Sequence, residues 1–207
     1  KTNAKTNETP NEVNTWKPST KKKDKVEPQA NTNKPEENPN KPKDNSKGTE
    51  GTGDVPKVTK GYDVTPKYST YDDRLKRTPV NKGEWSGERG ESKFVSEKPE
   101  VKKYLDEAGV DGVEYKNAMP DFSPFTKAEV KIPNMTSDRR KNFAMADEIL
   151  AKEWSTPEKK WTAGDVADWR EDNNYTWHEL NDLKGMQLVP SKINGTYNHL
   201  GGVGEHK

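Results

Sequence analysis

Two short segments near the C-terminus, Thr176-Trp177-His178-Glu179-Leu180 and Met186-Gln187-Leu188-Val189-Pro190, have the pattern of a β-hairpin. The first strand is expected to begin at Tyr175, in a run of β-favouring residues, and residues 181–185 supply turn chemistry. Pro190 suits the first turn of a helix, which is expected to end near Asn198, before two glycines. The stretch therefore predicts a strand–turn–strand–helix unit over about residues 175–204.

This unit contains two of the chain's three histidines, and the third, His206, lies just beyond it. A hairpin followed by a helix can bring His178 and Glu179 close to Asn194 and His199. Two imidazole nitrogens, a carboxylate and an amide oxygen form a mixed ligand set for Mg²⁺, Mn²⁺ or Zn²⁺. Asn194 and His199 lie on different sides of a regular helix, so the helix must end before His199 if both bind.

The alternative interpretation of the same residues is a hairpin with a solvated histidine and a capping asparagine. His206 fits no position of the pattern and is expected in a frayed tail.

Upstream of the hairpin, residue patterns predict a mostly helical region. A short helix is expected from Pro99 to Ala108, ended by Gly109, and a long one from about Ser137 to Trp154, capped by Thr136 or Ser137. A further helix begins at Thr162-Ala163-Gly164-Asp165, which resembles a capping box. Short strands are expected at residues 110–113 and 130–132. Arg139-Arg140-Lys141 is interpreted as a solvated helical turn, with a local basic strip as the alternative. The predicted fold class is α+β.

Residues 1–60 differ sharply in composition from the rest of the chain. They consist mainly of Lys, Asn, Thr, Pro and Glu, with Trp16 as the only aromatic residue. Such a segment cannot bury enough apolar surface to offset the entropy of ordering it, so a disordered linker is expected. Residues 61–207 are then one domain. Because the chain begins with lysine, it is expected to be a piece of a longer protein.

Charge and composition restrict the classes of function. Residues 1–60 hold 13 Lys and 9 Asp or Glu, a balance of +4, so the overall +1 leaves −3 for residues 61–207. This domain lacks the basic surplus of a typical nucleic-acid binder. The absence of cysteine excludes disulfides, thiol nucleophiles and Cys-ligated zinc. No stretch is apolar enough to span a membrane, and no stable membrane association is expected.

The C-terminal pattern resembles nucleases of the HNH/endonuclease VII superfamily, in particular the branch marked by Trp-His-His. Members of that branch read Thr-Trp-His-His, then Met-Gln-Leu-Val-Pro, then His, then Gly-His-Thr-Gly-Gly. The matching positions here are Thr176, Trp177, His178, residues 186–190, His199, Gly201 and Gly202. Glu179 replaces the second histidine of the pair, and Asn194 replaces the penultimate one. A weaker resemblance of residues 85–92 and 120–124 to secreted Gram-positive toxins extends the coverage to about residues 74–204.

The resemblance implies a ββα-metal unit and assigns roles to its residues. Carried over strictly, His178, Asn194 and His199 hold a divalent metal ion, and Glu179 is the general base. The competing assignment makes His178 the base and Glu179 a ligand, because a carboxylate near a cation is a poorer base at neutral pH. Gln187 falls where relatives carry a residue that orients the base. Arg89 and Glu91 are the implied phosphate clamp and its partner.

The resemblance also implies a function: a metal-dependent endonuclease, with DNA favoured over RNA, at the C-terminus of an LXG-like polymorphic toxin. Such a toxin is secreted from a bacterium, acts in the cytoplasm of a target cell, and requires a cognate immunity protein in the producer. The alternative is a degenerate HNH-like module that binds nucleic acid or a protein partner without cleaving. A third reading, a structural protein of the cell wall, rests on the linker composition alone.

Overall fold

The computed structural model describes residues 57–206, so the predicted linker lies outside the described residues except at its last four positions. One of those positions, Thr59, contacts the folded part: its hydroxyl and amide donate hydrogen bonds to Glu129 at 2.6 and 3.0 Å. The described part mixes helices and strands, which confirms the α+β class. Its elements are η1 Gly61–Asp63, α1 Tyr71–Leu75, β1 Gly83–Trp85, β2 Lys93–Ser96, η2 Pro99–Val101, α2 Lys102–Ala108, β3 Val113–Lys116, β4 Met119–Pro120, η3 Ser123–Phe125, β5 Ala128–Lys131, α3 Arg139–Trp154, α4 Ala163–Asn173, β6 Tyr175–Glu179, β7 Gly185–Pro190, α5 Ser191–Thr196 and α6 Gly202–Glu205.

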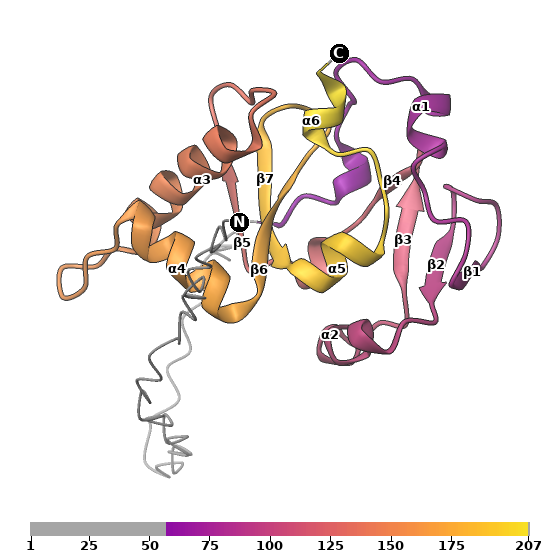
Figure 1. Ribbon diagram of the computed structural model, residues 1–207, viewed down its shortest axis with the longest axis horizontal. Coiled ribbons are helices and arrows are strands. Elements are labelled where there is room, and N and C mark those ends of the chain that lie inside the picture. The colour runs from indigo at the N-terminus through magenta and orange to yellow at the C-terminus, as the bar shows by residue number, and fades with distance from the viewer. Residues whose placement is uncertain (1–56, 207) are drawn as a thin grey trace, which may run out of the picture. The chain divides into compact units, whose positions relative to one another are not determined.

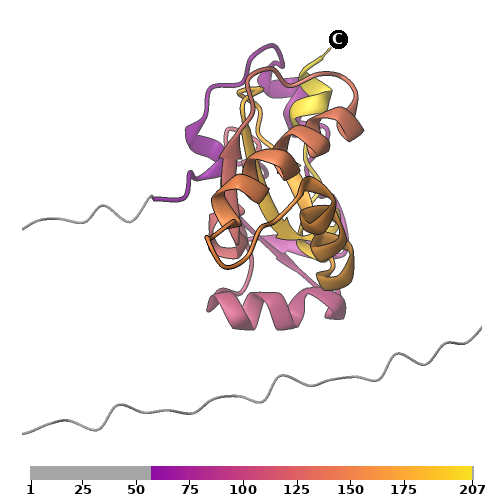
Figure 2. The same ribbon diagram turned by 90° about the vertical axis from the view of Figure 1, so that its left-hand side faces the viewer.

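The predicted hairpin is present as β6 and β7 and belongs to an antiparallel sheet of order β5-β7-β6. Helices α3 and α4 cover one face of this sheet, as Figure 1 shows from the side and Figure 2 shows with the helices in front. Alternate residues of a strand point to opposite faces. Trp177 and Leu188 accordingly join the core beneath α3 and α4, together with Leu150 and Val166.

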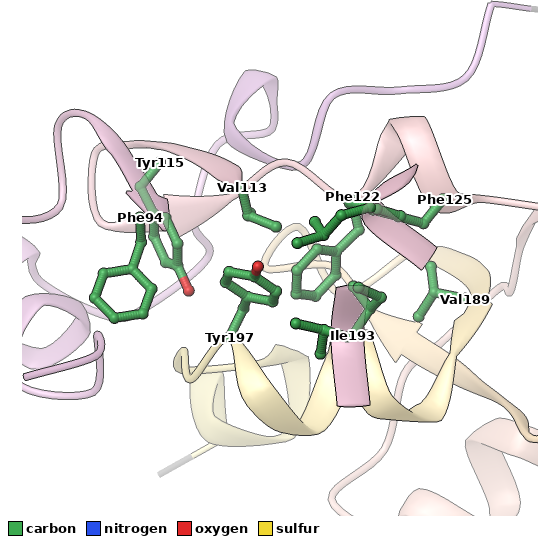
Figure 3. Packing of buried hydrophobic residues seen from close by; sticks show 10 residues of the cluster. Phe94, Val113, Tyr115, Phe122, Phe125, Val189, Ile193 and Tyr197 are labelled. Carbon is green, nitrogen blue, oxygen red and sulfur yellow. The ribbon is translucent and has the colours of Figure 1, made fainter. Parts of the chain in front are cut away.

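The opposite face of the sheet meets a second core, drawn in Figure 3. Phe122 and Val113 pack in this core against Val189 of β7, Ile193 of α5 and Tyr197, which follows α5. The first sheet, of order β1-β2-β3-β4, contributes to this second core through Phe94 and Tyr115, which are drawn in the same figure. The edge strand β6 therefore lies between two separately packed layers, and its two faces pack against different hydrophobic cores.

The two long helices begin at side-chain caps. Thr162 and Asp165 form the capping box predicted for α4. Helix α3 begins at Arg139 and is capped by Asp138, so the expected cap at Thr136 or Ser137 is wrong. The reason is that the Thr136 hydroxyl and amide both donate to the side-chain oxygen of Asn142, at 2.9 and 2.7 Å. That contact holds Thr136 outside the helix.

The region before the hairpin is less helical than expected. Four strands between residues 83 and 120 form one sheet, and each strand is only two to four residues long and shows no extended alternation. Gly83–Trp85 is the first of these strands. The strand expected at residues 110–113 lies at Val113–Lys116, because Val110 to Gly112 connect it to α2. The helix expected from Pro99 to Ala108 is confirmed, with Gly109 at φ 68° as its cap.

The C-terminal segment is anchored rather than frayed. Glu205 of α6 is fully buried, and its carboxylate accepts hydrogen bonds from the amides of Tyr68 and Ser69, the Ser69 hydroxyl and the Asn181 amide. His206, expected in a disordered tail, caps α6 and is half-buried. Within residues 57–206, no helix has the length and apolarity needed to cross a membrane.

Candidate active site

A pocket of about 610 Å³ lies along the edge strand β6. Both faces of the strand border it, because the pocket wraps around the edge that pairs with no other strand of this sheet. Its walls come from four parts of the chain: the segment after α1, the start of α3, β6, and the segment from α5 to α6. The lining residues are Lys76, Arg77, Thr78, Val80, Arg139, Phe143, Thr176, Trp177, His178, Glu179, Asn194, Gly195, Asn198, His199 and Gly201.

The two histidines of the pattern meet in this pocket. The imidazole rings of His178 and His199 lie edge to face, with their centroids 4.7 Å apart. The ring of Phe122 packs against both, at 4.7 Å from His178 and 5.4 Å from His199. Three rings in mutual contact restrict one another's rotation, so the imidazoles are held in place without a ligand.

Burial controls the protonation of both rings. Desolvation and the neighbouring His199 lower the pKa of His178 well below its usual range, while the Asn194 side chain acts in the opposite direction. Desolvation also lowers the pKa of His199, opposed by a hydrogen bond to the Tyr197 carbonyl and aided by the charge of Arg139. Both imidazoles are therefore neutral near pH 7, which is the form that binds a metal ion.

A backbone contact orients the His199 ring. Its Nδ1 atom lies 2.7 Å from the carbonyl oxygen of Tyr197, which can only accept a hydrogen bond. The proton of the neutral ring is therefore on Nδ1, and the lone pair is on Nε2. The hydroxyl of Tyr115 in β3 donates to the carbonyl of Asn198 at 3.0 Å and fixes the loop that precedes the ring. Helix α5 ends at Thr196, earlier than the expected Asn198, and this frees His199 from the helical spacing.

Asn194 completes a group of three side chains. Its Oδ1 atom and the Nδ1 atom of His178 are both buried, and neither makes a hydrogen bond of regular geometry among the described residues, although the Asn194 side chain lies close enough to His178 to raise the pKa of that imidazole. Buried polar atoms without partners are uncommon in proteins because each one costs desolvation free energy. Two imidazoles and an amide oxygen that border one pocket fit a divalent cation in the donor chemistry that they offer.

Glu179 enters the pocket from the other face of β6. Its carboxylate accepts a hydrogen bond from the Asn142 amide at 2.8 Å and one from Nε of Arg139 at 3.2 Å. Because the Thr136 amide and hydroxyl donate to the side-chain oxygen of Asn142, the side-chain nitrogen of Asn142 faces Glu179. Within residues 57–206, no group of three or more His, Cys, Asp or Glu side chains is arranged to hold a metal ion. Glu179 and the two histidines thus do not converge on one point.

The other three predicted site residues lie away from this pocket. Gln187 is opposite His178 in the hairpin register, but its amide nitrogen donates to the Thr59 carbonyl at 2.6 Å and to Glu129 at 2.9 Å. Arg89 donates to the carbonyls of Leu75 and Thr78 and to the Thr78 hydroxyl.

The Glu91 carboxylate accepts a hydrogen bond from the backbone amide of Asn117. The geometry therefore does not join Arg89 and Glu91 as a pair within the pocket.

The structure adds residues that the sequence analysis did not place in the site. The sequence predicts that Arg139 lies in a solvated helical turn, with a local basic strip as the alternative, and it assigns no role to Asn142, Lys76, Arg77 or Phe122. One signal was present: Arg139 and Asn142 are three residues apart, so they share a helical face. That signal does not reveal which strand the face meets.

The comparisons with known proteins agree with this location. No curated protein and no solved structure matches the chain. Residues 112–201, which include His178, Glu179, Asn194 and His199, match a family described as the DNase/tRNase domain of colicin-like bacteriocin. The match covers less than half of the chain, and it supports a nuclease toxin domain.

Proposed function

We propose that residues 61–207 are a metal-dependent endonuclease of the HNH type that hydrolyses phosphodiester bonds, with DNA favoured over RNA. The observation that carries the proposal is that His178, Asn194 and His199 line one pocket, where buried polar atoms of His178 and Asn194 make no hydrogen bond of regular geometry among the described residues. These residues lie within the segment that matches a nuclease family.

The three side chains would hold the divalent cation. Both imidazoles are neutral because burial lowers the pKa of each. The Tyr197 carbonyl keeps the proton of His199 on Nδ1, which presents Nε2 as the donor atom. A bound cation would polarise the scissile phosphate and stabilise the leaving oxygen. The contribution of the chain is to keep the donors ordered, which the packing of Phe122 against both rings supports.

Glu179 is proposed as the general base, in the strict assignment of roles. Two observations favour this over a role as a ligand. Its oxygens are already oriented by Asn142 and Arg139, and it does not converge with both histidines. As the base, the carboxylate would take a proton from the attacking water inside the pocket. In this proposal the residues that hold the cation and the residue that activates water are different side chains.

Gln187, Arg89 and Glu91 are proposed to support the site from outside the pocket. Gln187 joins β7 to Thr59 and Glu129 by hydrogen bonds. It lies opposite His178 on the neighbouring strand of the sheet. Arg89 fixes the turn at Leu75–Thr78, which supplies part of the pocket wall. This role replaces the phosphate clamp implied by resemblance.

The biological role is proposed from the family match of residues 112–201. A domain matching the nuclease of colicin-like bacteriocins would be the C-terminal toxin of an interbacterial competition system, secreted by the producer and active in the cytoplasm of the target cell. The producing cell would need a cognate immunity protein that blocks the pocket. This part of the proposal is tested by whether a neighbouring gene product binds the chain and inhibits cleavage.

The nuclease activity is tested on the full chain with a plasmid and with a structured RNA, in EDTA and with Mg²⁺, Mn²⁺ or Zn²⁺. We expect metal-dependent cleavage that His178→Ala abolishes and His206→Ala leaves intact, because His206 lies outside the pocket. Glu179→Gln should reduce the rate without weakening metal binding. A folded chain that cleaves neither substrate with any of these metals would contradict the proposal and favour the binding module.

A further inference from the structure

The pocket carries a local charge that the domain as a whole does not. Residues 61–207 have a net charge of −3, which counts against binding of nucleic acid. Of the charged residues lining the pocket, Lys76, Arg77 and Arg139 are cations and Glu179 is the only carboxylate. Affinity for a phosphate backbone depends on the charge at the contact surface rather than on the net charge of the domain. The pocket therefore offers a cationic surface within an acidic domain.

Arg139 is the most constrained of these cations. Its Nε atom donates to Glu179, whose side chain is 3% exposed, while the Arg139 side chain is 61% exposed. Asn142 donates a hydrogen bond to the other oxygen of the same carboxylate, so the Glu179 side chain that holds Arg139 is itself fixed in place. Within residues 57–206, no hydrogen bond engages the two terminal nitrogens of Arg139. The guanidinium is thus held at one nitrogen and open at the other two.

We propose that Arg139 binds a backbone phosphate of the nucleic acid at the mouth of the pocket, and that Lys76 and Arg77 contact neighbouring phosphates. This inference rests on the proposed nuclease function and names the residues that position the substrate. The planar guanidinium matches two phosphate oxygens, and its orientation by Glu179 reduces the entropy lost on binding. Lys76 and Arg77 are exposed, with side chains that make no ion pair within the described chain.

The contact with Arg139 also controls the position of the Glu179 carboxylate. A base at this position must be correctly placed, and the Arg139 contact holds the carboxylate in one position in the absence of substrate. When Arg139 contacts a phosphate through its terminal nitrogens, Nε can keep its bond to Glu179. One residue then links the position of the phosphate to the position of the carboxylate.

The test measures binding without cleavage. The full chain is titrated into a fluorescein-labelled DNA duplex in EDTA, by anisotropy, over a series of salt concentrations. Arg139→Ala should weaken binding about tenfold at low salt. It should also reduce the slope of log K against log salt by about 1. Arg140→Ala is the matched control, because the neighbouring Arg140 is exposed, of equal charge, and outside the pocket. It should change binding much less.

Arg139→Gln separates loss of the phosphate contact from loss of folding. Glutamine can still donate a hydrogen bond to Glu179 but carries no charge, so this variant should be folded by circular dichroism and bind DNA as weakly as Arg139→Ala. Equal effects of Arg139→Ala and Arg140→Ala, or wild-type binding by Arg139→Gln, would overturn the inference. If the Arg139 effect is present but no metal supports cleavage, the proposed function fails and the phosphate contact stands.

Discussion

The rings of His178 and His199 meet edge to face at a centroid distance of 4.7 Å, and Phe122 closes the group as a third ring. Both imidazoles are uncharged near neutral pH, because burial lowers the pKa of each. Two neutral imidazoles and the buried Asn194 oxygen in one pocket offer donor atoms to a cation.

Metal affinity should respond to the charge at position 194. Asn194→Asp places a carboxylate where the amide oxygen lies, and carboxylates bind hard cations more strongly. We expect Asn194→Asp to bind Mn²⁺ more tightly than the wild-type chain and Asn194→Ala to bind it at least tenfold more weakly, measured by isothermal titration calorimetry. Equal affinity in all three chains would remove Asn194 from the proposed ligand set.

The contact beneath Trp177 should be important for stability. Asp147 accepts two hydrogen bonds from Arg170, at 2.8 and 2.7 Å, and one from the Trp177 indole at 2.8 Å. Both ionised side chains are largely buried, so Asp147→Ala leaves a buried cation unpaired and should cost about 3–5 kcal/mol.

Glu148→Ala is the matched control for Asp147→Ala. The neighbouring Glu148 pairs with Lys152 at the surface, and both side chains are exposed, so its loss should cost no more than about 1 kcal/mol. Urea denaturation of both variants measures the difference, and similar midpoints would show that the buried pair contributes little.

The two adjacent glycines should differ in their tolerance of a side chain. A Cβ atom at Gly202 would lie 2.4 Å from the Met135 sulfur, 2.8 Å from the Leu180 carbonyl oxygen and 3.0 Å from Cβ of Glu179. At Gly201 the nearest atom would be 3.8 Å away. Gly202→Ala should therefore lower stability by about 1–3 kcal/mol and displace Glu179, while Gly201→Ala should not. Thermal denaturation checks the first effect, and a wild-type melting temperature for Gly202→Ala would contradict it.

The stabilisation from Glu205 should depend on pH. Burial acts to raise the pKa of this carboxyl, but hydrogen bonds from Asn181, Ser69 and Tyr68 outweigh it, so the pKa lies below its ordinary value of 4.5. A lowered pKa in the folded state means that the stabilisation is complete above about pH 4.5 and is lost as the pH falls through the folded value.

Glu205→Gln measures this contribution. We expect the variant to be about 2 kcal/mol less stable than the wild type at pH 7, with a difference that shrinks under acidic conditions. Urea denaturation at a series of pH values gives the comparison. A difference that stays constant down to acidic pH would show that the charge of Glu205 is not what the network stabilises.

Local residue patterns were enough to predict the hairpin, the α4 capping box and the helix ended by Gly109. Each depends on contacts between residues a few positions apart, such as Thr162 with Asp165. The short strands of the first sheet could not be predicted in the same way. Strands of two to four residues carry too little alternation to be distinguished from loops, and their pairing joins segments that local patterns do not connect.

The histidine pair was predictable because one motif contains both residues and a hairpin followed by a helix brings its ends together. The pairing of Glu179 with Arg139 was not predictable from the sequence. Arg139 belongs to α3, which covers one face of the sheet (Figure 1), and no pattern within that helix indicates which strand it will contact. Residue types and spacing determined which groups could do chemistry. Packing of two layers against the two faces of one edge strand decided which cation reaches the carboxylate, because that contact depends on how distant segments bury their apolar surfaces.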